Sequence, residues 1–143
     1  MGSRPVVLVT GAARRVGRSI ALELAANGHD IAVHHRRSPD DAQATVQAAR
    51  QAGAQAEAFC ADLADEAATS RLFDEVAAAF GRVDAVVNNA SAFEHDDVGS
   101  FGYALLERMM RANCAPAVLL SRALHAHLQL RGGRGCVVNL LDQ

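Results

Sequence analysis

The chain has 143 residues, half of them apolar, with 14 basic residues, 16 acidic residues and a formal net charge of −2. This length is usual for one domain, and the charge provides no extended basic surface for nucleic acid. No apolar run approaches the length needed to span a bilayer, and Met1–Pro5 lacks the features of a secretory signal, so we expect a cytoplasmic protein without a membrane partner.

Apolar segments of strand length alternate with longer segments of helical period, the pattern of repeated βαβ units. In chain order we expect a strand at Val6–Thr10, a helix at about Val16–Asn27, a strand at Ile31–His35, a helix at Pro39–Gln51, a strand at Ala56–Ala61, a helix between Asp65 and Gly81, a strand at Ala85–Asn88, a helical region at Tyr103–Leu130 and a strand at Cys136–Leu141. The pattern predicts an α/β fold with a doubly wound parallel sheet of the Rossmann type, a single domain over residues 1–143 that stops after its fifth strand.

Individual residues predict where the helices begin and end. Gly28 is expected to end the first helix in a left-handed conformation, and Ser38 is expected to cap the second, with Pro39 at its first position. Asp65 is expected to cap the third helix. Pro116 is expected to bend or divide the last helical region, because proline interrupts helical hydrogen bonding.

We predict no metal site. His34 and His35 are adjacent on a strand and point to opposite faces, while His125 and His127 are two apart on a helix and diverge. The three cysteines are widely scattered without C-x-x-C spacing, as expected for small buried residues in a reducing compartment.

The segment Thr10–Gly17 joins the first strand to the first helix. In this position small residues let backbone amides approach a pyrophosphate, and the positive end of the helix dipole faces the anion. The alternative interpretation is a tight turn without a ligand. A second polar loop, Ala90–Gly102, follows the fourth strand, at the sheet edge where α/β proteins bind their ligands.

The end of the second strand indicates which dinucleotide would bind. An NAD site carries an acidic residue about 20 residues beyond the glycine turn, and this sequence has none there. The segment His34-His35-Arg36-Arg37-Ser38 instead offers guanidinium groups, a hydroxyl and a helix N-terminus, which suit the 2′-phosphate of NADP. Arg14 is expected to approach the same phosphate. A solvated cluster of surface arginines is the alternative.

Four motifs in order and spacing resemble the short-chain dehydrogenase/reductase family, over about the first half of a usual member. They are the turn from Thr10-Gly11 to Gly17, the pair Asp62-Leu63 after the third strand, Asn88-Asn89-Ala90 after the fourth strand, and Asn113 in the long helical region. The resemblance implies hydride transfer from NADPH, a small-molecule substrate and a homo-oligomer, often a tetramer.

Three departures from the common family pattern resemble pteridine reductases. Arg15 replaces the second glycine of the turn, Ser91 stands where most members have glycine, and Asp142 follows the fifth strand where most members have serine. By this resemblance Arg15 contacts both cofactor and pterin, and Phe93 stacks on the pterin ring. In the alternative, Arg15 is surface charge, Phe93 covers the core and Asp142 is a turn residue.

The resemblance assigns the site residues. The cofactor-binding residues are expected to be Gly11, Arg14, Arg15, Val16, Gly17, His35, Arg36, Arg37, Ser38, Asp62, Leu63, Asn89, Ala90 and Ser91. The substrate-binding residues are expected to be Arg15, Ser91, Phe93 and Asp142, and the catalytic residues Asn113 and Asp142.

The family's proton donor is the tyrosine of a Tyr-x-x-x-Lys motif. This sequence has no lysine, and its single tyrosine, Tyr103, lies upstream of Asn113 with Glu107 at the lysine spacing. We therefore expect this segment alone to be inactive and to belong to a longer protein. The hypotheses are an NADPH-dependent pterin or dihydropterin reductase, a reductase of another carbonyl such as an oxoacyl thioester or a sugar, and a non-catalytic nucleotide-binding protein.

Overall fold

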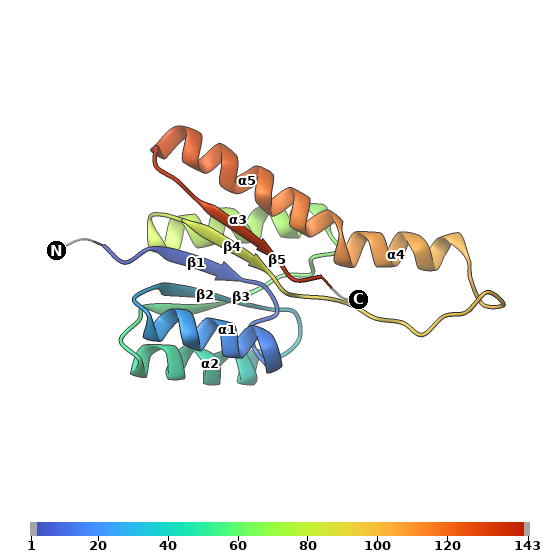
Figure 1. The fold of residues 1–143 in the computed structure, drawn as a ribbon, viewed down its shortest axis with the longest axis horizontal. Helices are drawn as coiled ribbons and strands as arrows, with labels where there is room; N and C mark the ends of the chain where they lie inside the picture. Colours follow the sequence, from blue (N-terminus) through green and yellow to red (C-terminus); the bar gives the residue numbers. More distant parts are fainter. Residues whose placement is uncertain (1–2, 142–143) are drawn as a thin grey trace.

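Five parallel strands form one sheet with helices on both faces in the computed structural model, which describes residues 3–141 (Figure 1). The elements are β1 (Val6–Val9), α1 (Arg15–Ala26), β2 (Asp30–His35), α2 (Pro39–Gln51), β3 (Ala56–Cys60), α3 (Glu66–Phe80), β4 (Ala85–Asn88), α4 (Tyr103–Asn113), α5 (Ala115–Arg131) and β5 (Cys136–Asn139). The strand order is β3-β2-β1-β4-β5. The chain thus winds outward from β1 in both directions, and the predicted doubly wound sheet is confirmed.

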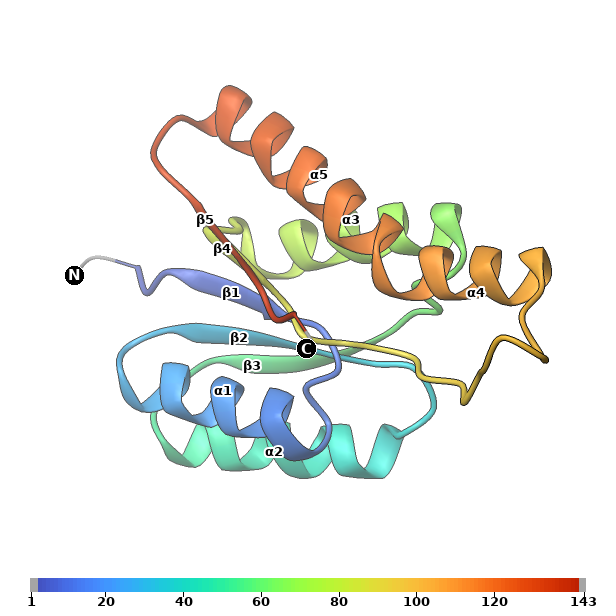
Figure 2. The same ribbon diagram turned by 45° about the vertical axis from the view of Figure 1, so that its right-hand side comes forward.

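The central strands are apolar because both of their faces are covered. All four residues of β1 are buried, and Leu8 and Val9 are completely inaccessible. One face packs against α1 and α2 through small side chains such as Ala21 and Ala49, and the other packs against α3 and α5 through Leu72 and Leu120 (Figures 1 and 2). The alanines of α1 and α2 permit a close approach to the sheet, whereas larger side chains fill the space between the sheet and α3 and α5.

The helix boundaries confirm most of the predicted signals. The Asp65 carboxylate accepts a hydrogen bond from the Ala68 N–H (2.9 Å), and Gly28 has a φ of +92°. The predicted positions of Ser38 and Pro39 at the start of α2 are confirmed, but the predicted side-chain cap is wrong. Ser38 stands at the N-cap position of α2, but its hydroxyl makes no bond to the helix and instead accepts one from the Arg14 guanidinium (3.0 Å). The guanidinium of Arg14, which belongs to the glycine turn, therefore binds the hydroxyl oxygen that would have capped the helix.

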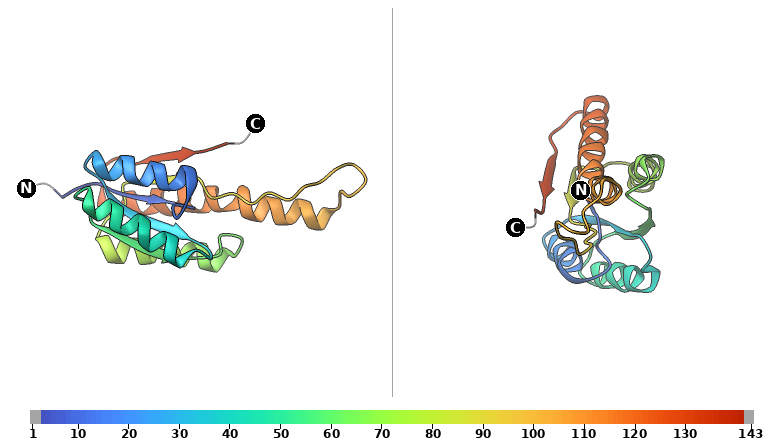
Figure 3. Two further views of the ribbon diagram at one scale, coloured as in Figure 1. Left: turned by 90° about the horizontal axis from the view of Figure 1, so that it is seen from below. Right: turned by 90° about the vertical axis from the view of Figure 1, so that its right-hand side faces the viewer.

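The predicted helical region after β4 is divided into two helices. α4 ends at Asn113, and α5 begins at Ala115 with Pro116 in its first turn, so the expected interruption near the proline is confirmed. None of the residues of α4 is buried. Figure 3 shows that α4 and the preceding loop extend beyond the layered part of the molecule.

The cysteines contradict the expectation of burial. Cys60, Cys114 and Cys136 are all exposed. Cys60 and Cys136 belong to the two edge strands, and Cys114 lies between α4 and α5, so the packed layers cover none of these positions. Within residues 3–141, no helix is long and apolar enough to cross a membrane.

The amino end of the sheet is held together by the Asp84 carboxylate, which precedes β4. It accepts hydrogen bonds from the backbone N–H of Val6 (2.8 Å) and from the guanidinium groups of Arg82 (2.6 and 2.7 Å) and Arg131 (2.9 Å). Burial raises the pKa of Asp84, but these bonds and the two positive charges outweigh it and hold the pKa below its usual 3.8. One side chain thus ties together β1, β4 and the end of α5.

We predict that Asp84→Asn lowers the free energy of unfolding by roughly 1–3 kcal/mol at neutral pH, because the arginines lose their charged partner. Because the native pKa is lowered, the contribution of Asp84 is complete above about pH 3.8 and is lost as the pH falls below it. Urea denaturation of the full-length protein at several pH values measures both effects. Asp74→Asn, at an exposed position of α3, is the control and should be neutral. Equal losses from the two variants would contradict the role of Asp84.

Candidate dinucleotide site

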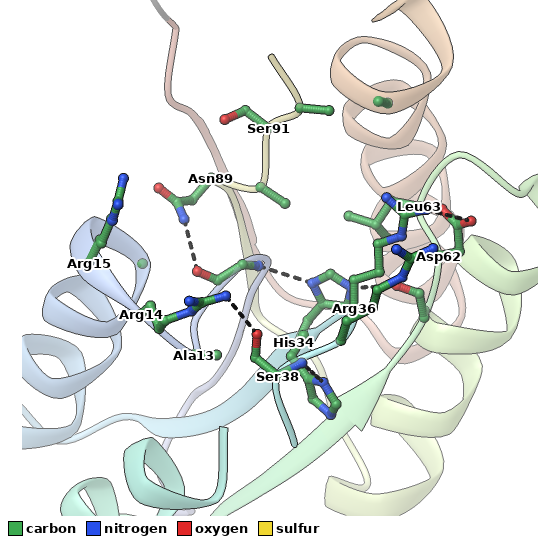
Figure 4. Close-up of a pocket in the computed structure, with 18 of the residues that line it drawn as sticks. Ala13, Arg14, Arg15, His34, Arg36, Ser38, Asp62, Leu63, Asn89 and Ser91 are labelled. Atoms are coloured by element: carbon green, nitrogen blue, oxygen red, sulfur yellow. Dashed lines mark hydrogen bonds and ion pairs between the residues drawn. The ribbon is translucent and has the colours of Figure 1, made fainter. Parts of the chain in front are cut away.

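Four connecting segments meet at the carboxyl edge of the sheet, next to the point where the strand order reverses. They surround an open cavity of about 490 Å³ (Figure 4). The lining residues are Gly11, Ala13, Arg14, Arg15, Val16, Gly17, His34, His35, Arg36, Arg37, Ser38, Ala61, Asp62, Leu63, Ala64, Asn89, Ala90, Ser91, Ala92 and Ala112. Every residue predicted to bind the cofactor is among them, so the structure brings the whole predicted set together.

The glycine turn is packed against α1 and against the end of β4. Gly11 has a φ of +62°, and a Cβ added at Gly17 would lie 2.1 Å from the Gly11 carbonyl oxygen. The side chain of Asn89 donates to the carbonyls of Thr10 (3.1 Å) and Gly11 (3.2 Å), while the Thr10 hydroxyl accepts from the N–H groups of Asn89 and Ala90 (3.0 Å each). These contacts fix the turn between two strands and leave no space for a side chain at Gly17.

The first turn of α1 opens into this cavity. The helix begins at Arg15, and Arg18 N–H donates to the Arg14 carbonyl, so the preceding amides from Arg15 to Gly17 have no partner within the helix. Unpaired amides and the positive end of the helix dipole favour an anion here. The cavity therefore has the donors required for a phosphate or a pyrophosphate.

Basic side chains line the far end of the cavity. Arg14 donates to the Ser38 hydroxyl (3.0 Å) and forms an ion pair with Asp41 (3.3 Å). Arg36 pairs with Asp62 (3.6 Å), and Arg37 is exposed on the same rim. Arg14 and Ser38 are thus held together across the gap between the glycine turn and α2, with the guanidinium donating to the hydroxyl (Figure 4).

Arg15 has an unusual backbone. Its φ of +53° makes it the one non-glycine residue with a positive φ within residues 3–141. A left-handed conformation costs an L-residue roughly 1–2 kcal/mol relative to the right-handed one, and glycine avoids that cost. Arg15 thus adopts, in the wall of the cavity, a conformation that glycine would adopt without strain.

His34 lines the cavity and was not among the predicted site residues. The side chain is 2% exposed, its Nδ1 accepts from the Gly11 N–H (3.0 Å), and its Nε2 lies 2.9 Å from the Ala61 carbonyl oxygen. Burial lowers the pKa of His34, an effect that the hydrogen bond to Ala61 partly offsets and the neighbouring His35 reinforces. His34 lies in the segment that was expected from the sequence to suit the 2′-phosphate, but no role was predicted for the imidazole ring itself.

Of the predicted substrate and catalytic residues, Arg15 and Ser91 line the cavity, whereas Phe93 and Asn113 do not. The Asn113 side chain accepts from the Ala92 N–H (2.7 Å) and donates to the Ala92 carbonyl (2.8 Å), so it fixes the loop that carries Ser91. Phe93 is 80% exposed and contacts the edge of His95, with ring centroids 6.1 Å apart. Asp142 lies outside the described residues. No group of three or more potential metal ligands occurs in the part of the chain that the structure describes.

Comparisons with known proteins identify the relatives of the chain. The short chain dehydrogenase family model matches residues 5–141. The chain is 40% identical over 116 residues to the 1-cyclohexenylcarbonyl-CoA reductase of Streptomyces collinus, covering 81% of this chain and 41% of that protein.

Two solved structures have the same fold. A short chain dehydrogenase from Burkholderia cenocepacia in complex with NADP has a TM-score of 0.87 at 35% identity, covering 97% of this chain and 55% of that one. FolM, alternative dihydrofolate reductase 1 from Brucella canis complexed with NADP, has a TM-score of 0.90 at 33% identity, covering 98% of this chain and 56% of that one. The chain spans about half the length of these relatives.

We predict that Gly17→Ala abolishes measurable dinucleotide binding, because its Cβ would overlap the Gly11 carbonyl and force α1 away from the turn. Fluorescence titration of the full-length protein with NADPH measures the effect. Gly102→Ala is a matched control, since Gly102 has extended backbone and no atom within 4 Å of the added Cβ. If both variants bind as the parent does, the turn is not part of the ligand site.

Proposed function

Because the chain belongs to the short chain dehydrogenase family, we propose that it forms the dinucleotide site of an NADPH-dependent oxidoreductase acting on a small molecule. The observation that carries this proposal is the contact between Arg14 and Ser38 at the end of β2. A guanidinium and a hydroxyl meet there at a position where an NAD site carries an acid. The two NADP-bound neighbours support the same choice.

The cavity residues fit such a dinucleotide. The amides at the start of α1 would bind the pyrophosphate, and Arg14, Arg37 and Ser38 would bind the 2′-phosphate. Asp62 and Leu63 would enclose the adenine. Asn89, Ala90 and Ser91 would contact the other end of the dinucleotide. NADPH, when bound, would supply the hydride. The protein's own contribution in this half is binding, orientation and exclusion of water.

For the substrate we propose a pterin or dihydropterin, with Arg15, Ser91 and Phe93 in its wall and Asn113 as a positioning residue. The support from this chain is the strained backbone of Arg15. Glycine would adopt the same φ without strain, so we infer that a contact of the arginine side chain offsets the cost. Phe93, which is largely uncovered, is an aromatic face available for stacking. The dihydrofolate reductase neighbour adds to this support.

A second candidate is the reduction of another carbonyl, such as an oxoacyl thioester or a sugar. It is favoured by the 40% identity to a reductase whose name specifies a CoA thioester. The exposed arginines of the cavity rim would suit the phosphates of such a carrier equally well. Discrimination between the two candidates depends on turnover rather than on binding of the dinucleotide.

We also propose that the protein forms a homo-oligomer. α4 has no buried residue, and its apolar side chains Leu106 and Met110 are about half exposed. Val118 on α5 is 66% exposed. A second copy of the protein would cover these side chains, since large exposed apolar surface favours association.

We predict that the full-length protein binds NADPH at least about tenfold more tightly than NADH, a difference of roughly 1.4 kcal/mol. Arg14→Gln should reduce this preference to about threefold or less while leaving NADH binding nearly unchanged, because the lost contact is to the 2′-phosphate. Isothermal titration with both cofactors measures the preference. Arg18→Gln, on α1 but outside the cavity wall, is the control. Equal or tighter binding of NADH by the parent protein would overturn the proposed phosphate site.

We predict that Arg15→Gly and Arg15→Ala separate backbone strain from side-chain function. Glycine relaxes the positive φ and should stabilise the protein by about 1 kcal/mol, whereas alanine should not. Both variants should lose at least about tenfold in kcat/KM for a dihydropterin, because both lack the guanidinium. Chemical denaturation and steady-state kinetics of the full-length protein measure the two effects.

The same assay distinguishes the candidate functions. Turnover of oxoacyl thioesters or sugars without turnover of pterins would select the second candidate. Tight NADPH binding without reduction of any carbonyl or pterin would favour a non-catalytic nucleotide-binding protein. Reduction of pterins by both Arg15 variants at the rate of the parent protein would contradict the role assigned to the Arg15 side chain.

A further inference from the structure

His34 is a buried, titratable side chain at the centre of the candidate site, and its contacts specify a single tautomer. A backbone N–H can only donate, so the 3.0 Å contact from Gly11 requires an unprotonated Nδ1. Nε2 must then carry the proton, which it donates to the Ala61 carbonyl at 2.9 Å. The neutral ring with hydrogen on Nε2 is the one form that satisfies both neighbours.

These two bonds connect the glycine turn to the end of β3 through the end of β2. The backbone of His34 adds a third link, because its carbonyl accepts from the Ala12 N–H (2.9 Å). His34 therefore binds the amides of both Gly11 and Ala12, and these amides do not face a ligand. The amides left for an anion are those that follow, at the start of α1.

The Gly11 peptide sets the position of those following amides. Its N–H is held by His34, its carbonyl by Asn89, and its Cα lies against Ala90 closely enough that an added Cβ would be 3.0 Å away. The Gly11 carbonyl in turn lies against Gly17, the third residue of α1. A rotation of this peptide would move the start of the helix and the amides that it presents.

We propose that His34 is the positioning residue of the glycine turn: its neutral imidazole holds the Gly11 peptide in the orientation that binds the dinucleotide, and protonation of the ring releases it. The inference rests on the proposed dinucleotide function and adds a regulatory proton to it. A protonated ring carries hydrogen on both nitrogens, so Nδ1 would then oppose the Gly11 N–H, donor against donor.

The surroundings of His34 determine the direction of the pH effect. Charged or titratable side chains lining the same cavity are His35 from β2, Arg36 and Arg37 from the loop after β2, Arg14 and Arg15 from the glycine turn, and Asp62 from the loop after β3. Neither β1 nor the lining segment 89–92 contributes a charged group. Burial and the neighbouring His35 lower the pKa of His34, so the ring is neutral at pH 7 and takes up a proton only in acid. Dinucleotide affinity is therefore expected to fall as the pH falls below the usual value of 6.5.

Two conservative variants separate positioning from simple filling of the core. In His34→Asn, the side-chain oxygen can take the place of Nδ1 and accept from Gly11, but the bond to Ala61 is lost. In His34→Gln, the amide can take the place of Nε2 and donate to Ala61, but the Gly11 N–H loses its acceptor. Each variant removes one buried hydrogen bond, so their thermal stabilities should be similar.

The expected result is a difference in affinity without a matching difference in stability. Fluorescence titration of the full-length protein with NADPH should give a Kd within about threefold of the parent for His34→Asn and at least about tenfold weaker for His34→Gln. If His34 only fills the core, the two substitutions should weaken NADPH binding equally, or only in proportion to the stability that each loses. Either of these results would overturn the proposal.

The pH profile is the second measurement. Between about pH 8 and about pH 5.5, the parent should lose at least about threefold more NADPH affinity than His34→Asn, which cannot take up the proton. Titration of the cofactor's own phosphate affects both proteins equally and therefore cancels. Parallel profiles, or a parent that binds relatively more tightly in acid, would overturn the proposal and leave the dinucleotide function intact.

The tautomer can also be observed without any ligand. Nitrogen chemical shifts of the His34 ring in the free protein should show an unprotonated Nδ1 and a protonated Nε2 at pH 7. The opposite tautomer would overturn the proposal by itself. Absence of NADPH binding by the parent protein would instead reject the proposed function, and with it the role of His34.

Discussion

The close contact between the Gly11 carbonyl and Gly17 is the constraint on which the candidate site depends. It brings the first turn of α1 directly onto the end of β1, so unpaired helix amides open at the carboxyl edge of the sheet. The side chains of Thr10 and Asn89 then connect this turn to the end of β4. Because β1 and β4 flank the point where the strand order reverses, the fixed turn lies where α/β sheets leave a crevice.

Hydrogen-bond donors and positive charges lie at different places around that crevice. The helix amides provide donors at its centre, and the arginines at its far end are held by neighbouring acids, Arg14 by Asp41 and Arg36 by Asp62. These ion pairs are exposed and contribute little to stability. They place the guanidinium groups of Arg14 and Arg36 at the rim of the cavity.

The fold was largely predictable because its signals are local. Alternation of apolar strands and helical segments gave the order of the elements, and the Asp65 cap and the break near Pro116 were each identified from a few neighbouring residues. The errors have a common origin. Ser38 was expected to cap its own helix, but a distant arginine binds its hydroxyl. The cysteines were expected to be buried, but two of them lie on the edge strands and the third lies between α4 and α5.

The sequence by itself determined that a glycine turn, a basic segment and two polar loops follow four successive strands. It also determined that these segments meet, since parallel strands bring their carboxyl ends to one edge. Only the tertiary structure decided which of these groups touch. The contacts of His34 with Gly11 and Ala61, of Arg14 with Ser38 and of Asn113 with Ala92 join residues 21 to 27 positions apart. No local pattern specifies such pairs. They depend on strand register and on the depth at which each helix packs, and these also select the tautomer of His34.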